Sequence, residues 1–167
     1  MSNIVLPTTR RKATDYNPRL LVIYGKAKSG KSTVMASLEN NLIIDLEDGY
    51  RALDVMCIQA RTAQDMFEIK NAIAEKNHEN GDKPFYRFIT IDNATRLEEM
   101  SLSYAAALYR KTPMGSNYGY KKDKIGNLLK DKNGNKVIDP KADVRQLPNG
   151  AGYTYTRKAL KEMINMF

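Results

Sequence analysis

The sequence predicts an α/β fold with a mostly parallel β-sheet, and two observations lead to it. Short apolar runs rich in β-forming residues alternate with longer stretches whose apolar residues recur at helical spacing. A segment rich in glycine and lysine, "GKAKSGKS", follows directly after the first apolar run. Strands that alternate with helices need crossover connections, and such connections place successive strands parallel to each other.

Four strands and four helices are expected, in alternating order over the first two thirds of the chain. The strands are the apolar runs 20–25, 41–49, 55–60 and 85–92, and the second of them, "NLIIDLEDG", ends in acids at Asp45 and Glu47. The first of them, "LLVIYG", should be buried on both faces, as strands in parallel sheets usually are. The helices should cover residues 31–40, a segment that Thr62 caps with Asp65 three places on, residues 93–110 and residues 153–167. From residue 111 the periodicity disappears, apart from a hairpin expected around Asn133-Gly134.

Composition narrows the class of protein. The chain has 167 residues, 42% of them hydrophobic, which is enough to form one domain with a core. No apolar run is long enough to cross a bilayer, and Cys57 is the only cysteine, so no internal disulfide can form. We therefore expect a cytoplasmic protein without a membrane partner.

The net charge of +8 is concentrated in one segment. Residues 110–158 contain twelve basic and four acidic residues, whereas the rest of the chain carries fifteen of each sign. An excess of lysine in one place indicates an anionic partner, although a solvated surface loop is the alternative.

The segment from Gly25 to Ser32 matches the phosphate-binding pattern G-x-x-x-x-G-K-[ST] at every defined position. Glycines let the backbone wrap closely around an anion, and consecutive N–H groups can then point at the phosphates. Lys31 should reach the β- and γ-phosphates of ATP, and Ser32 should supply a hydroxyl to Mg²⁺. The alternative is a glycine-rich turn that binds nothing. The nucleotide-binding residues expected from the pattern are Gly25, Lys26, Ala27, Lys28, Ser29, Gly30, Lys31, Ser32 and Thr33.

Acidic residues end two further strands, and ligands of such sheets bind beyond the carboxyl ends of the strands. Asp92 ends "FITID", as expected of a Walker B carboxylate that holds Mg²⁺ or its water. Asp45, Glu47 and Asp48 follow "LII", and one of them could activate water for attack on the γ-phosphate. The simpler alternatives are that Asp92 or Asn93 caps the following helix and that the other acids lie in a solvated loop.

Three blocks resemble the RecA-like ATPases, and within them the phage-type AAA ATPases related to single-strand annealing recombinases. They are "YGKAKSGKST", "IIDLEDGYRALD" and "FITIDNATRL", in the order of that family. The resemblance implies a three-layer P-loop NTPase fold with a RecA-like sheet. It also implies Glu47 as catalytic base, Lys31 and Ser32 as Walker A residues, and Asp92 as Walker B. Such proteins place a further strand between the phosphate-loop strand and the Walker B strand, so we expect a partial domain that lacks this strand at its C-terminal end.

The same resemblance suggests that residues 111–150, which follow the Walker B strand and its helix, contact single-stranded DNA. Lysines can neutralise phosphates, and interleaved tyrosines can stack on unpaired bases. The expected DNA contacts are Lys121, Lys122, Lys124, Arg145, Tyr118 and Tyr120, with Tyr153 and Tyr155 as further stacking candidates.

These observations favour a Mg²⁺-dependent ATPase that acts on single-stranded DNA in phage recombination or repair, in the host cytoplasm, with a ring or filament as possible assembly. Residues 1–17 would be an N-terminal extension, and residues 18–167 the ATPase domain, with 111–150 as a basic loop and hairpin insertion.

The main alternative is a P-loop kinase that uses 111–150 as a lid. Kinase lids usually hold phosphates with arginines, and Arg145 is the only arginine between residues 111 and 155. A nucleotide-dependent DNA-binding module without turnover is the third possibility, whereas a GTPase is disfavoured because "NKVID" departs from the N-K-x-D spacing.

Overall fold

The computed structural model describes residues 8–9 and 19–167. The chain divides into two units, one that ends at Lys31 and one that spans Ser32–Phe167. Apart from Thr8 and Thr9, the N-terminal extension expected at residues 1–17 lies outside the described residues.

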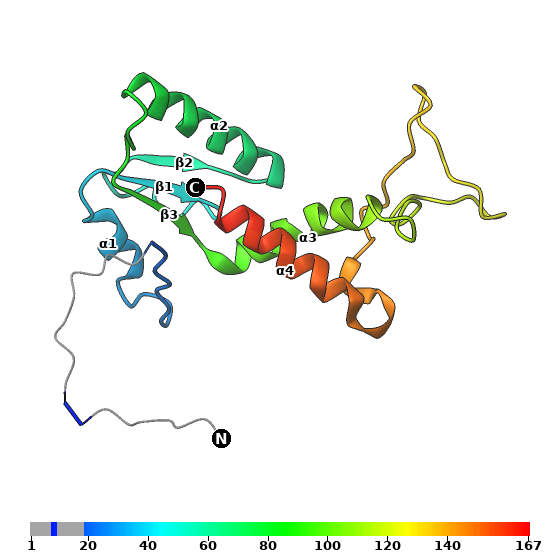
Figure 1. The fold of residues 1–167 in the computed structure, drawn as a ribbon, viewed down its shortest axis with the longest axis horizontal. Coiled ribbons are helices and arrows are strands. Elements are labelled where there is room, and N and C mark those ends of the chain that lie inside the picture. The colour runs from blue at the N-terminus through cyan, green and yellow to red at the C-terminus, as the bar shows by residue number, and fades with distance from the viewer. Residues whose placement is uncertain (1–7, 10–18) are drawn as a thin grey trace. The chain divides into compact units, whose positions relative to one another are not determined.

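A parallel three-stranded sheet lies at the centre of the second unit (Figure 1). The strands are β1 (Asn41–Asp45), β2 (Cys57–Gln59) and β3 (Phe88–Asp92), in the order β2-β1-β3. Asp45 pairs in register with Gln59 on one side and Asp92 on the other, so the carboxyl ends of all three strands are aligned. This arrangement confirms the predicted α/β class and its parallel sheet.

Helical segments lie on both faces of the sheet. Leu42 and Ile44 of β1 pair in register with Ile89 and Ile91 of β3, and these side chains join one core cluster with residues of three helices. The helices are α2 (Ala63–Glu79), α3 (Ala94–Arg110) and α4 (Ala151–Ile164). On the opposite face, Asn41 Nδ2 donates to the carbonyl of Met35 in the short helix α1 (Lys31–Ala36).

Local signals account for the helix boundaries. Thr62 and Asp65 form the predicted capping box at α2, because the Thr62 side chain accepts from the Asp65 N–H while the Asp65 carboxylate accepts from the Thr62 N–H. Helix α1 begins at Lys31 as expected but ends at Ala36, four residues earlier than the apolar spacing suggested.

The strand predicted at residues 20–25 is not formed. Leu20, Leu21, Val22, Ile23 and Tyr24 are between 45% and 93% exposed, and this run belongs to no sheet of the described residues. An apolar run becomes a strand only where a neighbouring strand accepts its backbone hydrogen bonds. Within the described sheet β3 pairs only with β1, so no strand of this sheet accepts hydrogen bonds from the run 20–25. The prediction that 20–25 is a buried strand was therefore wrong for this chain.

Residues 111–143 follow α3 and form a lysine-rich excursion with two turns of the same hydrogen-bond pattern. Asp123 accepts from the backbone N–H groups of Ile125 and Asn127 at 2.9 Å each, and Asp131 accepts from those of Asn133 and Asn135 at 2.9 and 2.8 Å. The second turn is the hairpin predicted around Asn133-Gly134, since Lys130 and Lys136 form an antiparallel bridge. The two turns share the sequence D-K-x-G-N, which occurs twice at a spacing of eight residues.

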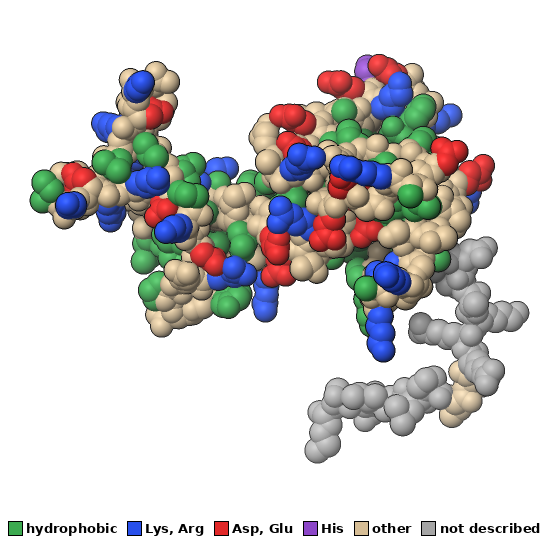
Figure 2. Space-filling model, turned by 180° about the vertical axis from the view of Figure 1, so that it is seen from behind, with side chains coloured by type: hydrophobic (Ala, Val, Ile, Leu, Met, Phe, Trp, Pro, Cys, Tyr) green, Lys and Arg blue, Asp and Glu red, His purple; other side chains and the backbone are tan. Residues whose placement is uncertain are grey.

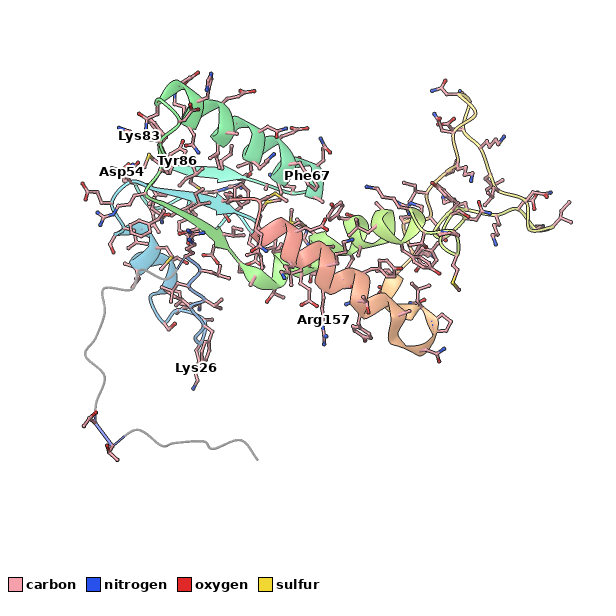
Figure 3. All side chains as sticks on the ribbon, viewed as in Figure 1. Lys26, Asp54, Phe67, Lys83, Tyr86 and Arg157 are labelled. Carbon is pink, nitrogen blue, oxygen red and sulfur yellow. The ribbon has the colours of Figure 1, made fainter. Side chains whose placement is uncertain are left out.

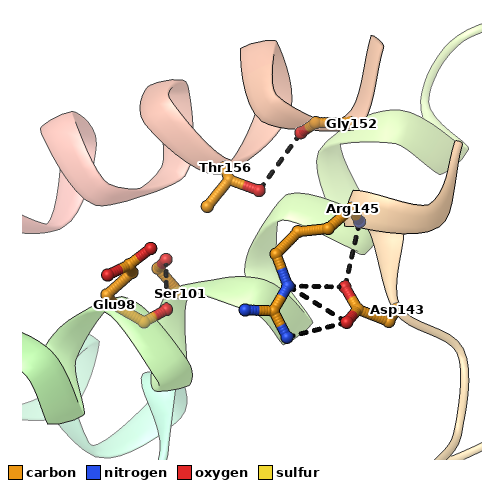
Figure 4. Close-up of polar contacts among 6 residues, drawn as sticks. All are labelled: Glu98, Ser101, Asp143, Arg145, Gly152 and Thr156. Carbon is orange, nitrogen blue, oxygen red and sulfur yellow. Dashed lines mark hydrogen bonds and ion pairs between the residues drawn. The ribbon is translucent and has the colours of Figure 1, made fainter. Parts of the chain in front are cut away.

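A second small core holds the root of this excursion. Ala105 of α3, Val144 of the 3₁₀ turn η1 (Val144–Gln146) and Ala159 of α4 are fully buried together. The chain then enters α4 through a second 3₁₀ turn, η2 (Pro148–Gly150). Near this contact, Arg145 forms an ion pair with Asp143 and Thr156 donates to the Gly152 carbonyl (Figure 4). The excursion is thus anchored between α3 and α4 rather than hanging from a free loop.

Candidate functional site

The phosphate-loop residues form a tight turn that precedes α1. Gly30 has φ of +85°, a conformation that favours glycine, and a Cβ at Gly25 would lie 2.9 Å from Ser29 Oγ. Gly30 therefore has a backbone reason to be glycine, whereas at Gly25 a larger residue would require the Ser29 side chain to shift. The side chain of Lys26 extends away from the loop (Figure 3).

Lys31 folds back over this loop. Its Nζ donates to the carbonyls of Gly25 and Lys26 at 3.0 and 2.9 Å. An ammonium group held by two neutral carbonyls can exchange them for charged phosphate oxygens, which form stronger hydrogen bonds. The ammonium group of Lys31 therefore has the donor chemistry that a phosphate group requires.

Asp92 lies at the carboxyl end of β3 and accepts two hydroxyl hydrogen bonds. Ser32 Oγ donates to its Oδ2 at 3.2 Å, and Tyr50 Oη donates to the same oxygen at 2.6 Å. Asn93, and not Asp92, caps α3, because the Asn93 side chain accepts from the Arg96 N–H at 2.8 Å. A hydroxyl beside a carboxylate is the oxygen pair that Mg²⁺ takes from proteins, with water and phosphate as its other ligands.

No cluster of three or more His, Cys, Asp or Glu residues suited to a metal ion occurs in the part of the chain that the structure describes. A magnesium site built from Ser32 and Asp92 does not need such a cluster, because Mg²⁺ keeps most of its ligands as water and substrate oxygens.

The turn after β1 separates the roles of its three acids. Asp45 is buried, and its carboxylate accepts from the backbone N–H groups of Glu47 and Tyr50 at 2.9 and 3.4 Å. Asp48 pairs with Arg51, whose hydrogen bond holds the pKa of the Asp48 carboxyl below its usual value. Glu47 is exposed and forms no salt bridge with any residue that the structure describes. Of the three, Glu47 is the acid whose side chain is exposed and has no salt-bridge partner among the described residues.

A cavity of about 230 Å³ opens beside this turn. Glu47 lines it together with Arg61, which follows β2, and Arg96 of α3. Carboxylate and guanidinium groups therefore share one hollow near the carboxyl ends of β1 and β2.

Tyr50 is a site residue that the sequence did not predict. It is 4% exposed, and burial together with its hydrogen bond to Asp92 raises the pKa of its phenol, so the hydroxyl remains a donor. No motif position marks it, and only the short distance from the acidic run "LED" to a large aromatic residue hinted that the turn folds inward.

The structure divides the expected DNA-contact residues into two groups. Tyr118 packs edge-on against Tyr109 with ring centroids 5.1 Å apart, and Tyr155 also packs against the Tyr109 ring, with centroids 5.1 Å apart. Arg145 is engaged with Asp143 through two nitrogens (Figure 4). These three residues belong to the root of the excursion, where they are occupied with packing and pairing.

Tyr120 is also engaged, because the cations of Arg110 and Lys136 lie 5.4 and 5.2 Å from its ring centre. By contrast, three of the predicted contacts are exposed on the excursion, and all three are lysines: Lys121, Lys122 and Lys124. Tyr153 is also exposed, at the start of α4.

Two aspartates of the excursion, Asp123 and Asp131, are bound by backbone amides and form no salt bridge with a lysine that the structure describes. Backbone amides of its own turns hold the carboxyls of Asp123 and Asp131 and lower the pKa of each. None of the seven lysines between residues 121 and 141 forms a salt bridge with a residue that the structure describes. Figure 2 shows basic side chains, drawn in blue, projecting from several sides of this excursion, and within residues 111–143 all of these are lysines.

The parallel α/β sheet, the phosphate-loop pattern from Gly25 to Ser32 and the Ser32–Asp92 pair are typical of a P-loop NTPase. A family model described as an AAA domain matches residues 17–167, and the chain belongs to this family. Membership indicates a nucleotide-binding protein of the ATPase kind. Comparison with curated proteins and with solved structures returned no match. Among the described residues, no helix is both long and apolar enough to cross a membrane.

Proposed function

We propose that this chain is a Mg²⁺-dependent ATPase that couples ATP binding and hydrolysis to the binding of single-stranded DNA. The observation that carries the proposal is the pairing of a hydroxyl and a carboxylate, Ser32 and Asp92, in a chain that also carries a complete phosphate-loop pattern. The biological setting that fits best is phage DNA recombination or repair in the host cytoplasm.

Each residue has a defined task in this proposal. The loop from Gly25 to Thr33 binds the phosphates, and Lys31 exchanges its two carbonyl partners for phosphate oxygens. Ser32 and Asp92 would hold Mg²⁺, which would supply charge neutralisation at the phosphates. Glu47 accepts a proton from the attacking water, a task for which an exposed carboxylate with no salt-bridge partner among the described residues is suited.

The DNA part of the proposal depends on the excursion of residues 111–143. Its seven lysines from residue 121 onward are free of acidic partners among the described residues, so they can neutralise the phosphates of an extended strand. Because Tyr118, Tyr120 and Arg145 are engaged elsewhere, we propose that contacts to the sugar–phosphate backbone dominate and that base stacking contributes little. Assembly into a ring or filament would place several excursions along one strand.

The test is fluorescence anisotropy of a labelled single-stranded oligonucleotide titrated with the chain. It is carried out with and without ATP and Mg²⁺, at two salt concentrations. The proposal predicts salt-sensitive binding that ATP and Mg²⁺ strengthen. Absence of binding under every condition contradicts the DNA part and favours a P-loop kinase in which 111–150 serves as a lid.

A further inference from the structure

Tyr50 makes the shorter of the two hydrogen bonds to the Asp92 carboxylate. Its hydroxyl donates to Oδ2 at 2.6 Å, whereas Ser32 donates to the same oxygen at 3.2 Å. Hydroxyl donors bond to ionised carboxylates at about 2.5–2.7 Å when the bond is strong. Tyr50 is therefore the principal partner of Asp92 among the described residues.

The backbone fixes Tyr50 in this position from two directions. Asp45, 3% exposed, accepts from the Tyr50 N–H and from the Glu47 N–H, so one buried carboxylate ties down both ends of the turn. The Leu46 N–H donates to the Asp92 carbonyl at 2.8 Å, which joins the start of the same turn to the end of β3. The turn from Leu46 to Tyr50 thus holds Asp92 by its backbone and by its side chain.

Both hydroxyl bonds fall on one oxygen of the carboxylate. Oδ2 receives Ser32 and Tyr50, and Oδ1 receives no hydrogen bond from the described residues. A carboxylate held at one oxygen cannot rotate freely, so its other oxygen keeps a fixed direction. Groups that orient a metal ligand in this way commonly change metal affinity by about 10- to 100-fold when they are removed.

We propose that Tyr50 is a positioning residue that orients Asp92 for Mg²⁺, held in place by the turn that Asp45 closes. The inference rests on the proposed function, because it assigns Asp92 to the metal. The same carboxyl end of β1 would then carry two tasks, since the turn presents Glu47 outward to water and directs Tyr50 inward to the metal carboxylate.

A purely structural role is the competing explanation. A buried phenol needs a hydrogen-bond partner, and Asp92 could simply satisfy it. Both explanations expect some loss of stability when the hydroxyl is removed, but only the positioning role predicts a change in metal affinity.

Tyr50→Phe removes the hydroxyl and keeps the ring. Tyr104→Phe is the matched control, because Tyr104 donates to Glu162 at 2.6 Å, the same distance from a tyrosine to a carboxylate, between α3 and α4. The probe is Mn²⁺ in the presence of ADP, followed by electron paramagnetic resonance. A parallel titration with fluorescent ADP in EDTA reports nucleotide binding without metal.

We expect Tyr50→Phe to weaken Mn²⁺ binding about 10-fold or more while leaving metal-free ADP affinity within about twofold of wild type. The Tyr104→Phe control should match wild type in both titrations. Equal Mn²⁺ affinity in Tyr50→Phe and wild type would overturn the inference while the proposed function stands. A wild-type chain that binds no Mn²⁺ with ADP overturns the proposed function and this inference with it.

Asp45→Asn provides a second test if Tyr50→Phe does not fold, as judged by circular dichroism. An asparagine keeps one acceptor oxygen and loosens the turn without removing Tyr50. It should weaken Mn²⁺ binding in the same direction, and an unchanged Mn²⁺ affinity in the folded variant would contradict the inference.

Discussion

Gly152 lies where the first turn of α4 meets η1, and the packing there leaves room for nothing larger than hydrogen. A Cβ placed there would lie 1.7 Å from the Val144 carbonyl oxygen, 2.6 Å from the Val144 carbonyl carbon and 3.0 Å from Arg145 Cα. All three neighbours are backbone atoms, which cannot rotate away as the end of a side chain can. Gly152→Ala must therefore move α4 away from η1.

The cost can be worked out from this packing. In an open helix, replacing glycine by alanine gains about 1 kcal/mol from helix propensity. Here α4 and η1 must separate, and overpacking of this kind costs about 1–3 kcal/mol. The separation also opens the fully buried cluster of Ala105, Val144 and Ala159, and re-exposing a valine alone costs about 1.5 kcal/mol or more. We expect Gly152→Ala to lower the free energy of unfolding by about 2 kcal/mol, opposite in sign to the propensity effect.

Urea unfolding followed by circular dichroism measures this difference. Gly49→Ala is the control, because a Cβ at Gly49 meets no atom within 4 Å and its backbone does not require glycine. The control should stay within about 0.5 kcal/mol of wild type. A Gly152→Ala variant as stable as wild type would refute the close approach of α4 and η1 and the anchoring of the excursion that depends on it.

Three further predictions follow from the site and the excursion. Glu47→Gln should retain ATP binding and abolish hydrolysis, because glutamine keeps the size of the side chain but cannot accept the proton. Phosphate release measured under saturating ATP checks this expectation, and undiminished turnover would argue against Glu47 as the base. Lys121, Lys122 and Lys124 are exposed in and just before the first turn, and replacing all three by glutamine should weaken DNA binding. The salt-dependence slope should fall by up to about 0.7 for each DNA phosphate that is no longer neutralised. An unchanged slope in anisotropy titrations would remove these lysines from the interface. Acid should open the two repeated turns, because the backbone hydrogen bonds to Asp123 and Asp131 lower the pKa of each folded carboxyl below 3.8. The ionised carboxylates therefore hold the turns above that pH, and protonation releases them as the pH falls below it. Nuclear magnetic resonance of the Asn127 and Asn135 amides would detect that release, and amide shifts that do not move below pH 3.8 would contradict it.

Features with local causes could be predicted from the sequence. The capping box of Thr62 and Asp65 depends on a single four-residue stretch, and the structure contains it as expected. The alignment of Asp45 with Asp92 follows from two apolar runs that both end in an acid, since parallel strands place their carboxyl ends at one edge.

Features that depend on partners far away in the chain could not be predicted from the sequence. The run Leu20–Tyr24 has the composition of a buried strand, yet composition does not supply the neighbouring strand that would pair with it. Tyr50 is similar, because its role comes from meeting Asp92, a residue 42 positions away in the chain. The repeated turns are a different case, since D-K-x-G-N occurs twice at a spacing of eight residues and is visible in the sequence itself.

The central claim is that the loop from Gly25 to Thr33 binds a nucleotide through Lys31. The most direct measurement is equilibrium binding of a fluorescent ATP analogue, with Mg²⁺, to wild type and to Lys31→Ala. Among the described residues, the Lys31 ammonium donates only to carbonyls of its own loop, so its replacement should leave the fold intact, with an unchanged circular dichroism spectrum. We predict saturable binding by wild type and a loss of affinity of about tenfold or more in Lys31→Ala, since the charge-assisted bonds to phosphate would be missing. Equal affinity of the two proteins would contradict the claim.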